Sequence, residues 1–119
     1  MKAIEAAEKQ RAEEPSKPSL VAHLGDYYAA LGNRAKAVPL IRNAMALAPQ
    51  DPDVLVNASQ AYEALGMRAQ SLPLLMEALS RGYSAEMVKR IPELARLITD
   101  KKFRWPEPSD KGRASSGRQ

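Results

Sequence analysis

The sequence has no cysteine, and it has one histidine, one phenylalanine and one tryptophan among 119 residues. The absence of cysteine excludes disulfide bonds, thiolate zinc sites and cysteine nucleophiles, and it suits a reducing compartment. Because aromatic residues are only 5% of the chain, the core must use mainly aliphatic residues and alanine, which favours closely packed helices. No apolar run approaches the roughly 18–20 residues needed to cross a bilayer, and the N-terminal stretch lacks the apolar region of a signal peptide. We therefore expect one soluble, cytoplasmic domain.

The net charge of +4 is concentrated at the C-terminal end of the chain. Residues 101–119 carry six basic and two acidic side chains, whereas residues 1–100 carry twelve of each sign. The basic residues are Lys101, Lys102, Arg104, Lys111, Arg113 and Arg118. Such a segment can bind phosphates weakly and without sequence preference, but a solvated tail is the favoured interpretation. Nucleic acid is therefore an alternative partner and not the expected one.

An internal repeat of 34 residues is the strongest pattern in the chain. Residues 18–51 aligned with residues 52–85 give ten identical pairs, which share the string Y-x-A-L-G-x-R-A followed by P-L. The pairs are Pro18/Pro52, Tyr28/Tyr62, Ala30/Ala64, Leu31/Leu65, Gly32/Gly66, Arg34/Arg68, Ala35/Ala69, Pro39/Pro73, Leu40/Leu74 and Ala44/Ala78. A period of this length, with glycine at its middle and proline near its ends, predicts helix–turn–helix units.

Each unit has the apolar spacing of two helices. In the first unit, apolar residues from Val21 to Leu31 recur in steps of three and four. This spacing predicts a helix over 19–31 that ends at Gly32. A second helix is predicted over 34–47, and the second unit repeats the same plan 34 residues later.

The first unit resembles the tetratricopeptide repeat, whose pattern is W-x2-L-G-x2-Y, then A-x3-F, then P, over 34 residues. The matching residues are Val21 in the place of tryptophan, Leu24, Gly25, Tyr28, Ala37, Ile41 in the place of phenylalanine, and Pro49. The resemblance implies an all-α, right-handed array of helix–turn–helix repeats, an α-solenoid of about six helices. In such an array Gly25 and Ala37 would let the paired helices approach, while Tyr28 and Ile41 would fill the space between them. The second unit matches the family by side-chain size.

The repeat divides the chain into five segments. They are the second helix of an incomplete repeat at 1–15, repeats at 18–51 and 52–85, a capping helix and closing segment at 86–105, and a disordered basic tail at 106–119. The incomplete repeat lacks its first helix, so we expect either a truncated chain or a shortened array. A break of the capping helix before Pro92 is the open alternative, and Phe103 and Trp105 are expected to close the cap. Residues 82–103 are also similar to the closing segment of tetratricopeptide arrays in bacterial multidomain signalling proteins.

The sequence offers no set of residues for catalysis. His23 is its one histidine. The sequence has neither clustered carboxylates nor a phosphate-binding glycine loop. We therefore expect no enzyme activity, no cofactor and no metal, and we interpret His23 as a surface or edge residue. Tyr28 and Tyr62 have the spacing of the packing stripe, so we expect both in the core.

The resemblance implies that the first helix of each repeat lines a concave binding groove, on the side away from its packing stripe. The expected groove residues are Ser19, Ala22, Asp26 and Ala29 from the first repeat, Asp53, Val56, Asn57, Gln60 and Glu63 from the second, and Met87 and Arg90 from the cap. Family members that hold a C-terminal carboxylate use Lys and Asn on the first helix of one repeat and Asn on the first helix of the next. Of these residues only Asn57 is present here, so no carboxylate clamp is expected. Asp26, Asp53 and Glu63 make the groove acidic, which favours an extended peptide with basic or apolar side chains.

The sequence therefore predicts a protein–protein interaction scaffold that binds a peptide or a partner helix, as part of a larger protein or complex. The alternative is a homodimer, in which Ile4 and Ala7 of the N-terminal helix pair with a second copy. The identity of the partner does not follow from the repeat pattern.

Overall fold

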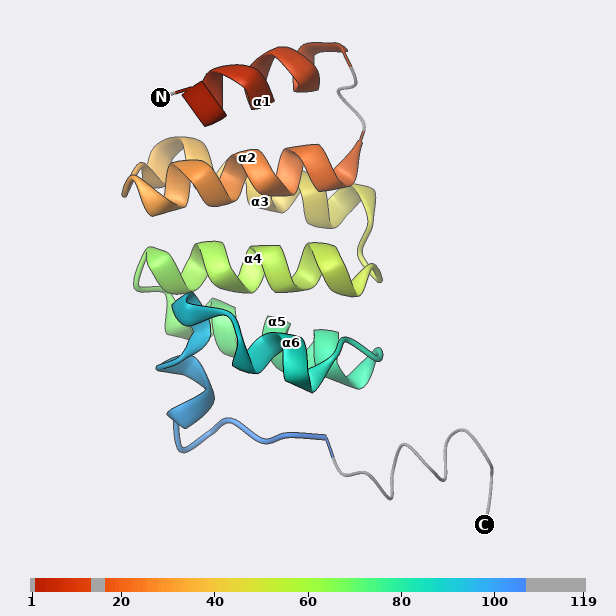
Figure 1. Ribbon diagram of the computed structural model, residues 1–119, viewed down its shortest axis with the longest axis vertical. Coiled ribbons are helices and arrows are strands. Elements are labelled where there is room, and N and C mark those ends of the chain that lie inside the picture. The colour runs from red at the N-terminus through yellow and green to blue at the C-terminus, as the bar shows by residue number, and fades with distance from the viewer. Residues whose placement is uncertain (1, 14–16, 107–119) are drawn as a thin grey trace.

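A computed structural model describes residues 2–13 and 17–106, and within these ranges the chain is helical and has no strand (Figure 1). Its α-helices are α1 Lys2–Glu13, α2 Pro18–Ala30, α3 Arg34–Leu47, α4 Pro52–Ala64, α5 Arg68–Ser80 and α6 Ala85–Lys89. Two short 3-10 turns follow, η1 Pro92–Leu94 and η2 Leu97–Thr99. The all-helical prediction is confirmed for the described residues, and six α-helices lie within them.

The helices recur with the period of the sequence. Helix α4 begins and ends 34 positions after α2, and α5 begins 34 positions after α3. The predicted helix over 34–47 has the bounds of α3, and the prediction over 19–31 differs from α2 by one residue at each end.

The same glycine turn ends the first helix of each hairpin. Gly32 and Gly66 have φ angles of 76° and 74°, a left-handed conformation that glycine adopts without steric cost. This turn lets the N–H of Asn33 donate to the carbonyl of Tyr28 at 2.9 Å, and the N–H of Met67 donates to Tyr62 at 2.8 Å. The terminal carbonyls are thereby satisfied and the chain reverses.

The helices form two layers. Figure 1 shows α2 and α4 side by side in front, with α3 and α5 behind them. Helix α2 packs against α3, α4 packs against α5, and α2 also packs directly against α4. Helix α1 lies against α2, and the hydroxyl of Tyr28 donates a hydrogen bond to Glu8 of α1.

The first hairpin closes around Gly25. A Cβ placed on Gly25 would lie 2.6 Å from Cδ1 and 3.3 Å from the backbone nitrogen of Ile41. Ala37 and Ile41 are fully buried, and Tyr28 and Tyr62 are 8% and 4% exposed. The predicted roles of these residues in helix packing are therefore confirmed.

The second hairpin has serine where the first has glycine and alanine. Ser59 and Ser71 are fully buried. The hydroxyl of Ser59 donates to the carbonyl of Ser71 at 2.8 Å, and the hydroxyl of Ser71 donates to Oε1 of Glu63 at 2.8 Å. Both hydroxyls are satisfied, so the small size of serine is used without leaving an unpaired polar group.

The C-terminal cap is a broken helix. Helix α6 ends at Lys89, and the chain continues as η1 and η2, because Pro92 has no N–H to donate and disfavours helix in the residue before it. The predicted 86–105 segment thus contains the break before Pro92. Val88, Leu94, Leu97 and Phe103 are buried, and the ring of Trp105 meets Phe103 edge-on at 4.8 Å between centroids.

Two sequence predictions lie outside the described residues. The side chains of Ile4 and Ala7 are not described, although both residues belong to helix α1. All but the first residue of the predicted tail at 106–119 also lies outside the described ranges.

The contact between Gly25 and Ile41 predicts the effect of Gly25→Ala. We expect the free energy of unfolding to fall by about 1 kcal/mol, because overpacking costs about 1–3 kcal/mol and the higher helix propensity of alanine offsets about 1 kcal/mol of that cost. Urea denaturation followed by circular dichroism measures the change. Ile41→Val removes Cδ1, so it should be less damaging in the Gly25→Ala background than in the wild type. A higher stability of Gly25→Ala than of the wild type would refute this packing.

Candidate partner-binding face

The structure separates the eleven predicted groove residues into three groups. Ala22, Ala29 and Val56 are at most 2% exposed. Ala22 and Ala29 lie in clusters that join α2 to α4, and Val56 lies in the cluster that contains Val88 of the cap. Asp26, Asn57, Gln60 and Glu63 are half-buried, while Ser19, Asp53, Met87 and Arg90 are exposed. The three buried residues therefore offer no surface to a partner.

One stripe on each front helix stays open. On α4 it consists of Asp53, Asn57, Gln60 and Ala64, which recur in steps of four, three and four. On α2 the residues 34 positions earlier, Ser19, His23, Asp26 and Ala30, are also exposed or half-buried. We call these eight residues the open face. His23 and Ala30 are open where Ala22 and Ala29 had been expected, a displacement of one residue around the helix.

A cleft of about 270 Å³ lies at the N-terminal ends of the two stripes. Its walls are Ser19, His23, Asp51, Asp53, Val54, Asn57 and Tyr83, and we call it the aspartate cleft. It brings together the predicted groove residues Ser19, Asp53 and Asn57. Tyr83 comes from the turn after α5 and was not expected here, because the sequence pattern does not show where that turn folds.

The polar groups of the aspartate cleft are largely unpaired. Asp51 caps α4, and its Oδ1 accepts a hydrogen bond from the N–H of Asp53 at 2.9 Å. The cleft's other polar side chains form no hydrogen bond or ion pair with a described residue; they are Ser19, His23, Asp53, Asn57 and Tyr83. Burial, and then the charge of Asp53, raises the pKa of the Tyr83 hydroxyl.

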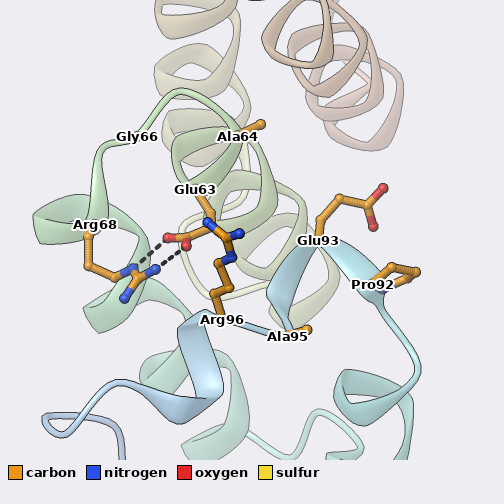
Figure 2. A pocket seen from close by; sticks show the side chains of 8 residues that line it. All are labelled: Glu63, Ala64, Gly66, Arg68, Pro92, Glu93, Ala95 and Arg96. Carbon is orange, nitrogen blue, oxygen red and sulfur yellow. Dashed lines mark hydrogen bonds and ion pairs between the residues drawn. The ribbon is translucent and has the colours of Figure 1, made fainter.

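A second cleft, of about 510 Å³, lies at the other end of α4. Figure 2 shows its lining residues, which are Glu63, Ala64, Gly66 and Arg68 from the second hairpin and Pro92, Glu93, Ala95 and Arg96 from the cap. Ala64 is the last residue of the α4 stripe, so the open face connects the two clefts. The side chain of Arg96 forms no hydrogen bond or ion pair with a described residue, whereas the guanidinium of Arg68 bonds to both Glu63 and Asp100.

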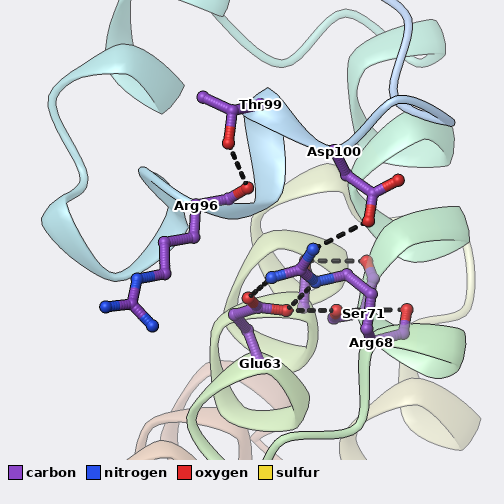
Figure 3. Close-up of polar contacts among 7 residues, drawn as sticks. Glu63, Arg68, Ser71, Arg96, Thr99 and Asp100 are labelled. Atoms are coloured by element: carbon purple, nitrogen blue, oxygen red, sulfur yellow. Dashed lines mark hydrogen bonds and ion pairs between the residues drawn. The ribbon is translucent and has the colours of Figure 1, made fainter.

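Arg68 ties the cap to the second hairpin (Figure 3). Its Nε donates to Oε1 of Glu63 at 2.8 Å, and its Nη1 donates to Oδ2 of Asp100 at 2.8 Å. Burial alone would raise the pKa of Glu63, but hydrogen bonds from Arg68 and Ser71 outweigh it and hold the pKa below its usual value. The charge of Glu63 is thus already compensated, and this predicted groove residue is not free to bind a cation.

Asp26 is the carboxylate at the centre of the open face. Its side chain is half-buried and forms no hydrogen bond with a described residue. Burial, and then the negative charge of Glu93 in the cap, raises the pKa of Asp26 to about 6. The acidity predicted from Asp26, Asp53 and Glu63 is therefore carried by Asp26 and Asp53, and Glu93 adds to it.

Within residues 2–13 and 17–106, no group of histidine and acidic side chains is arranged to hold a metal ion. The same part of the chain contains no helix with the length and apolar character needed to cross a bilayer. Comparisons with protein-family models, with curated proteins and with solved structures give no match.

The raised pKa of Asp26 predicts a pH dependence of stability. Its folded pKa of about 6 lies above the unfolded value of about 3.9, so the folded state binds the proton more tightly. The free energy of unfolding should therefore rise by about 1–2 kcal/mol as the pH falls from 7.5 to 5. Urea denaturation at the two pH values measures this, and Asp26→Asn should remove most of the rise. Glu77→Gln, on α5, is the control that should keep it; a wild type less stable at pH 5 would contradict the assignment.

The contacts of Arg68 predict a difference between two arginine substitutions. Arg68→Gln should lower the free energy of unfolding by about 1–2 kcal/mol, because the side chain of Glu63 is only 11% exposed and loses its charged partner. Arg81→Gln breaks the exposed pair with Glu77 and should cost less than about 1 kcal/mol. Hydrogen exchange of the amides at 92–103 should accelerate in the first variant alone. Equal effects of the two substitutions would exclude the role of Arg68 in holding the cap.

Proposed function

We propose that the chain is a short tetratricopeptide-type repeat module that binds a peptide or a partner helix on its open face, as a protein–protein interaction scaffold. The observation that carries this proposal is the set of polar side chains on the open face that lack partners within the described residues. Asp26, Asn57 and Gln60 are half-buried without a hydrogen bond to a described residue. Half-buried polar groups of this kind contribute most to the free energy of binding when a ligand supplies the missing hydrogen-bond partners.

The dimensions of the open face suit a short segment. Asp53 and Ala64 are eleven residues apart on α4, which corresponds to about 16 Å along a helix axis. An extended peptide of about five residues covers that length. A peptide could therefore lie along α4 from the aspartate cleft to the second cleft, with the side chains of Asn57 and Gln60 beside its backbone.

Charge favours a basic peptide. Asp26, Asp53 and Glu93 have no compensating partner among the described residues, whereas Glu63 is paired with Arg68. A peptide with basic and apolar side chains would complement this face, and the attraction should weaken as salt screens it.

Other expectations remain predictions. Self-association through Ile4 and Ala7 depends on side chains outside the described ones, and the same holds for most of the basic tail. The absence of enzyme activity and the cytoplasmic location likewise rest on the sequence alone.

A selection experiment tests the proposal. The full chain is used to select binders from a random dodecapeptide library, and the dissociation constants of the enriched peptides are measured by fluorescence anisotropy. We expect enrichment of basic and apolar residues, and binding that weakens about tenfold or more in Asn57→Arg/Gln60→Arg, which places two cations on the open face.

The matched control is Gln70→Arg/Ser80→Arg, which places the same two side chains on exposed, uncharged positions of α5 and should retain binding. Circular dichroism verifies that both variants are folded. Failure to enrich any peptide, or equal binding by both variants, would refute a binding site on the open face.

A further inference from the structure

The aspartate cleft has the composition of a site for one cationic side chain. Three parts of the chain converge on it: the first turns of α2, the cap and first turn of α4, and the turn after α5. Oxygen atoms dominate its polar groups, and they come from Ser19, Asp51, Asp53, Asn57 and Tyr83. Except for Oδ1 of Asp51, these side-chain oxygens accept no hydrogen bond from a described residue. A ligand rich in N–H donors would satisfy several of them at once.

Charge decides against an anion. Helix N-termini commonly bind anions through free N–H groups, but here the N–H of Asp53 is already bonded to Asp51 and Pro18 and Pro52 have no N–H, so each helix start offers fewer donors than usual. An anion in the cleft would also face two carboxylates. A cation instead meets the unpaired carboxylate of Asp53.

Size decides between a side chain and a larger molecule. The cleft measures about 270 Å³, which is below the range of about 300–1,000 Å³ typical of sites for drug-sized ligands. One long side chain fits this space better than a nucleotide or another ligand with several rings. The cleft also opens onto the α4 stripe through Asp53 and Asn57, so the rest of a bound peptide could continue along the open face.

We infer that the aspartate cleft receives a single lysine or arginine side chain of the partner peptide, with Asp53 as its ion-pair partner and Asn57 and Tyr83 as hydrogen-bond partners. This inference rests on the proposed binding function and adds which residue type the partner must present. It also places the cationic anchor at one end of the peptide, beside the N-terminus of α4.

Capped amino acids test the cleft without a peptide partner. The ¹H–¹⁵N spectrum of the full chain is titrated with N-acetyl-arginine amide, N-acetyl-lysine amide and the neutral isostere N-acetyl-citrulline amide. We expect both cations to shift the amide resonances of residues 19–23, 53–57 and 83. The citrulline compound should bind up to about fivefold more weakly than the cations. Equal shifts from the cationic and neutral compounds, or shifts confined to other residues, would overturn the inference.

Variants separate the cleft from the rest of the open face. Asp53→Asn should weaken arginine binding about fivefold and Tyr83→Phe by a smaller factor, whereas Glu77→Gln, an equal loss of charge on α5, should have no effect. Asp51 still caps α4 in Asp53→Asn, and circular dichroism confirms folding. If library-selected peptides bind the open face but tolerate Asp53→Asn, the cleft is not their anchor while the binding function stands. If the capped cations bind the cleft but no peptide is selected, the binding function fails while the chemistry of the cleft stands.

Discussion

The burial of α4 among its neighbouring elements is the constraint on which the rest of the structure depends. Helix α4 packs against α2, α3, α5 and η1. Its buried residues are Val54, Leu55, Val56, Ala58, Ser59, Ala61 and Tyr62, which together surround most of the helix. Only a narrow stripe is left for a ligand, and it runs from Asp53 to Ala64. The position of the proposed binding face is therefore a consequence of helix packing.

The sequence predicted the helices well, because their signals are local. Gly32 and Gly66 end helices through their own backbone conformation, and the identity of residues 34 positions apart makes each hairpin support the assignment of the other. The contact between Gly25 and Ile41 was also foreseeable, since a repeat with glycine at that place resembles a family in which two helices meet there. These features need no knowledge of how one hairpin meets the next.

The candidate site was harder to predict, because it depends on contacts between units. Ala22 and Ala29 were assigned to the groove, although small residues are typical of positions where helices approach closely, and the structure packs them against α4. Val56 is covered by a cap whose path after Pro92 the helical pattern does not specify. Arg68, which compensates Glu63, also pairs with Asp100 of the cap, 32 residues further along the sequence. Contacts between residues this far apart in the sequence leave no periodic pattern from which they could be predicted.

The charges of the protein are thus divided between structure and the proposed function. Glu63, Arg68 and Asp100 hold the cap on the second hairpin, while Asp26 and Asp53 remain without partners among the described residues. A charge that stays half-buried and unpaired, as Asp26 does, reduces stability at neutral pH. This cost is understandable if a basic partner offsets it on binding.

The direct packing of α2 against α4 is tested most directly by nuclear Overhauser effects between methyl groups in the isotope-labelled chain. The account predicts cross-peaks from Val54 to Val21 and Ala22, because these residues share one buried cluster, together with cross-peaks between Leu24 and Ile41 within the first hairpin. Cross-peaks within the hairpin without any between α2 and α4 would show that the hairpins do not stack, and would contradict the account.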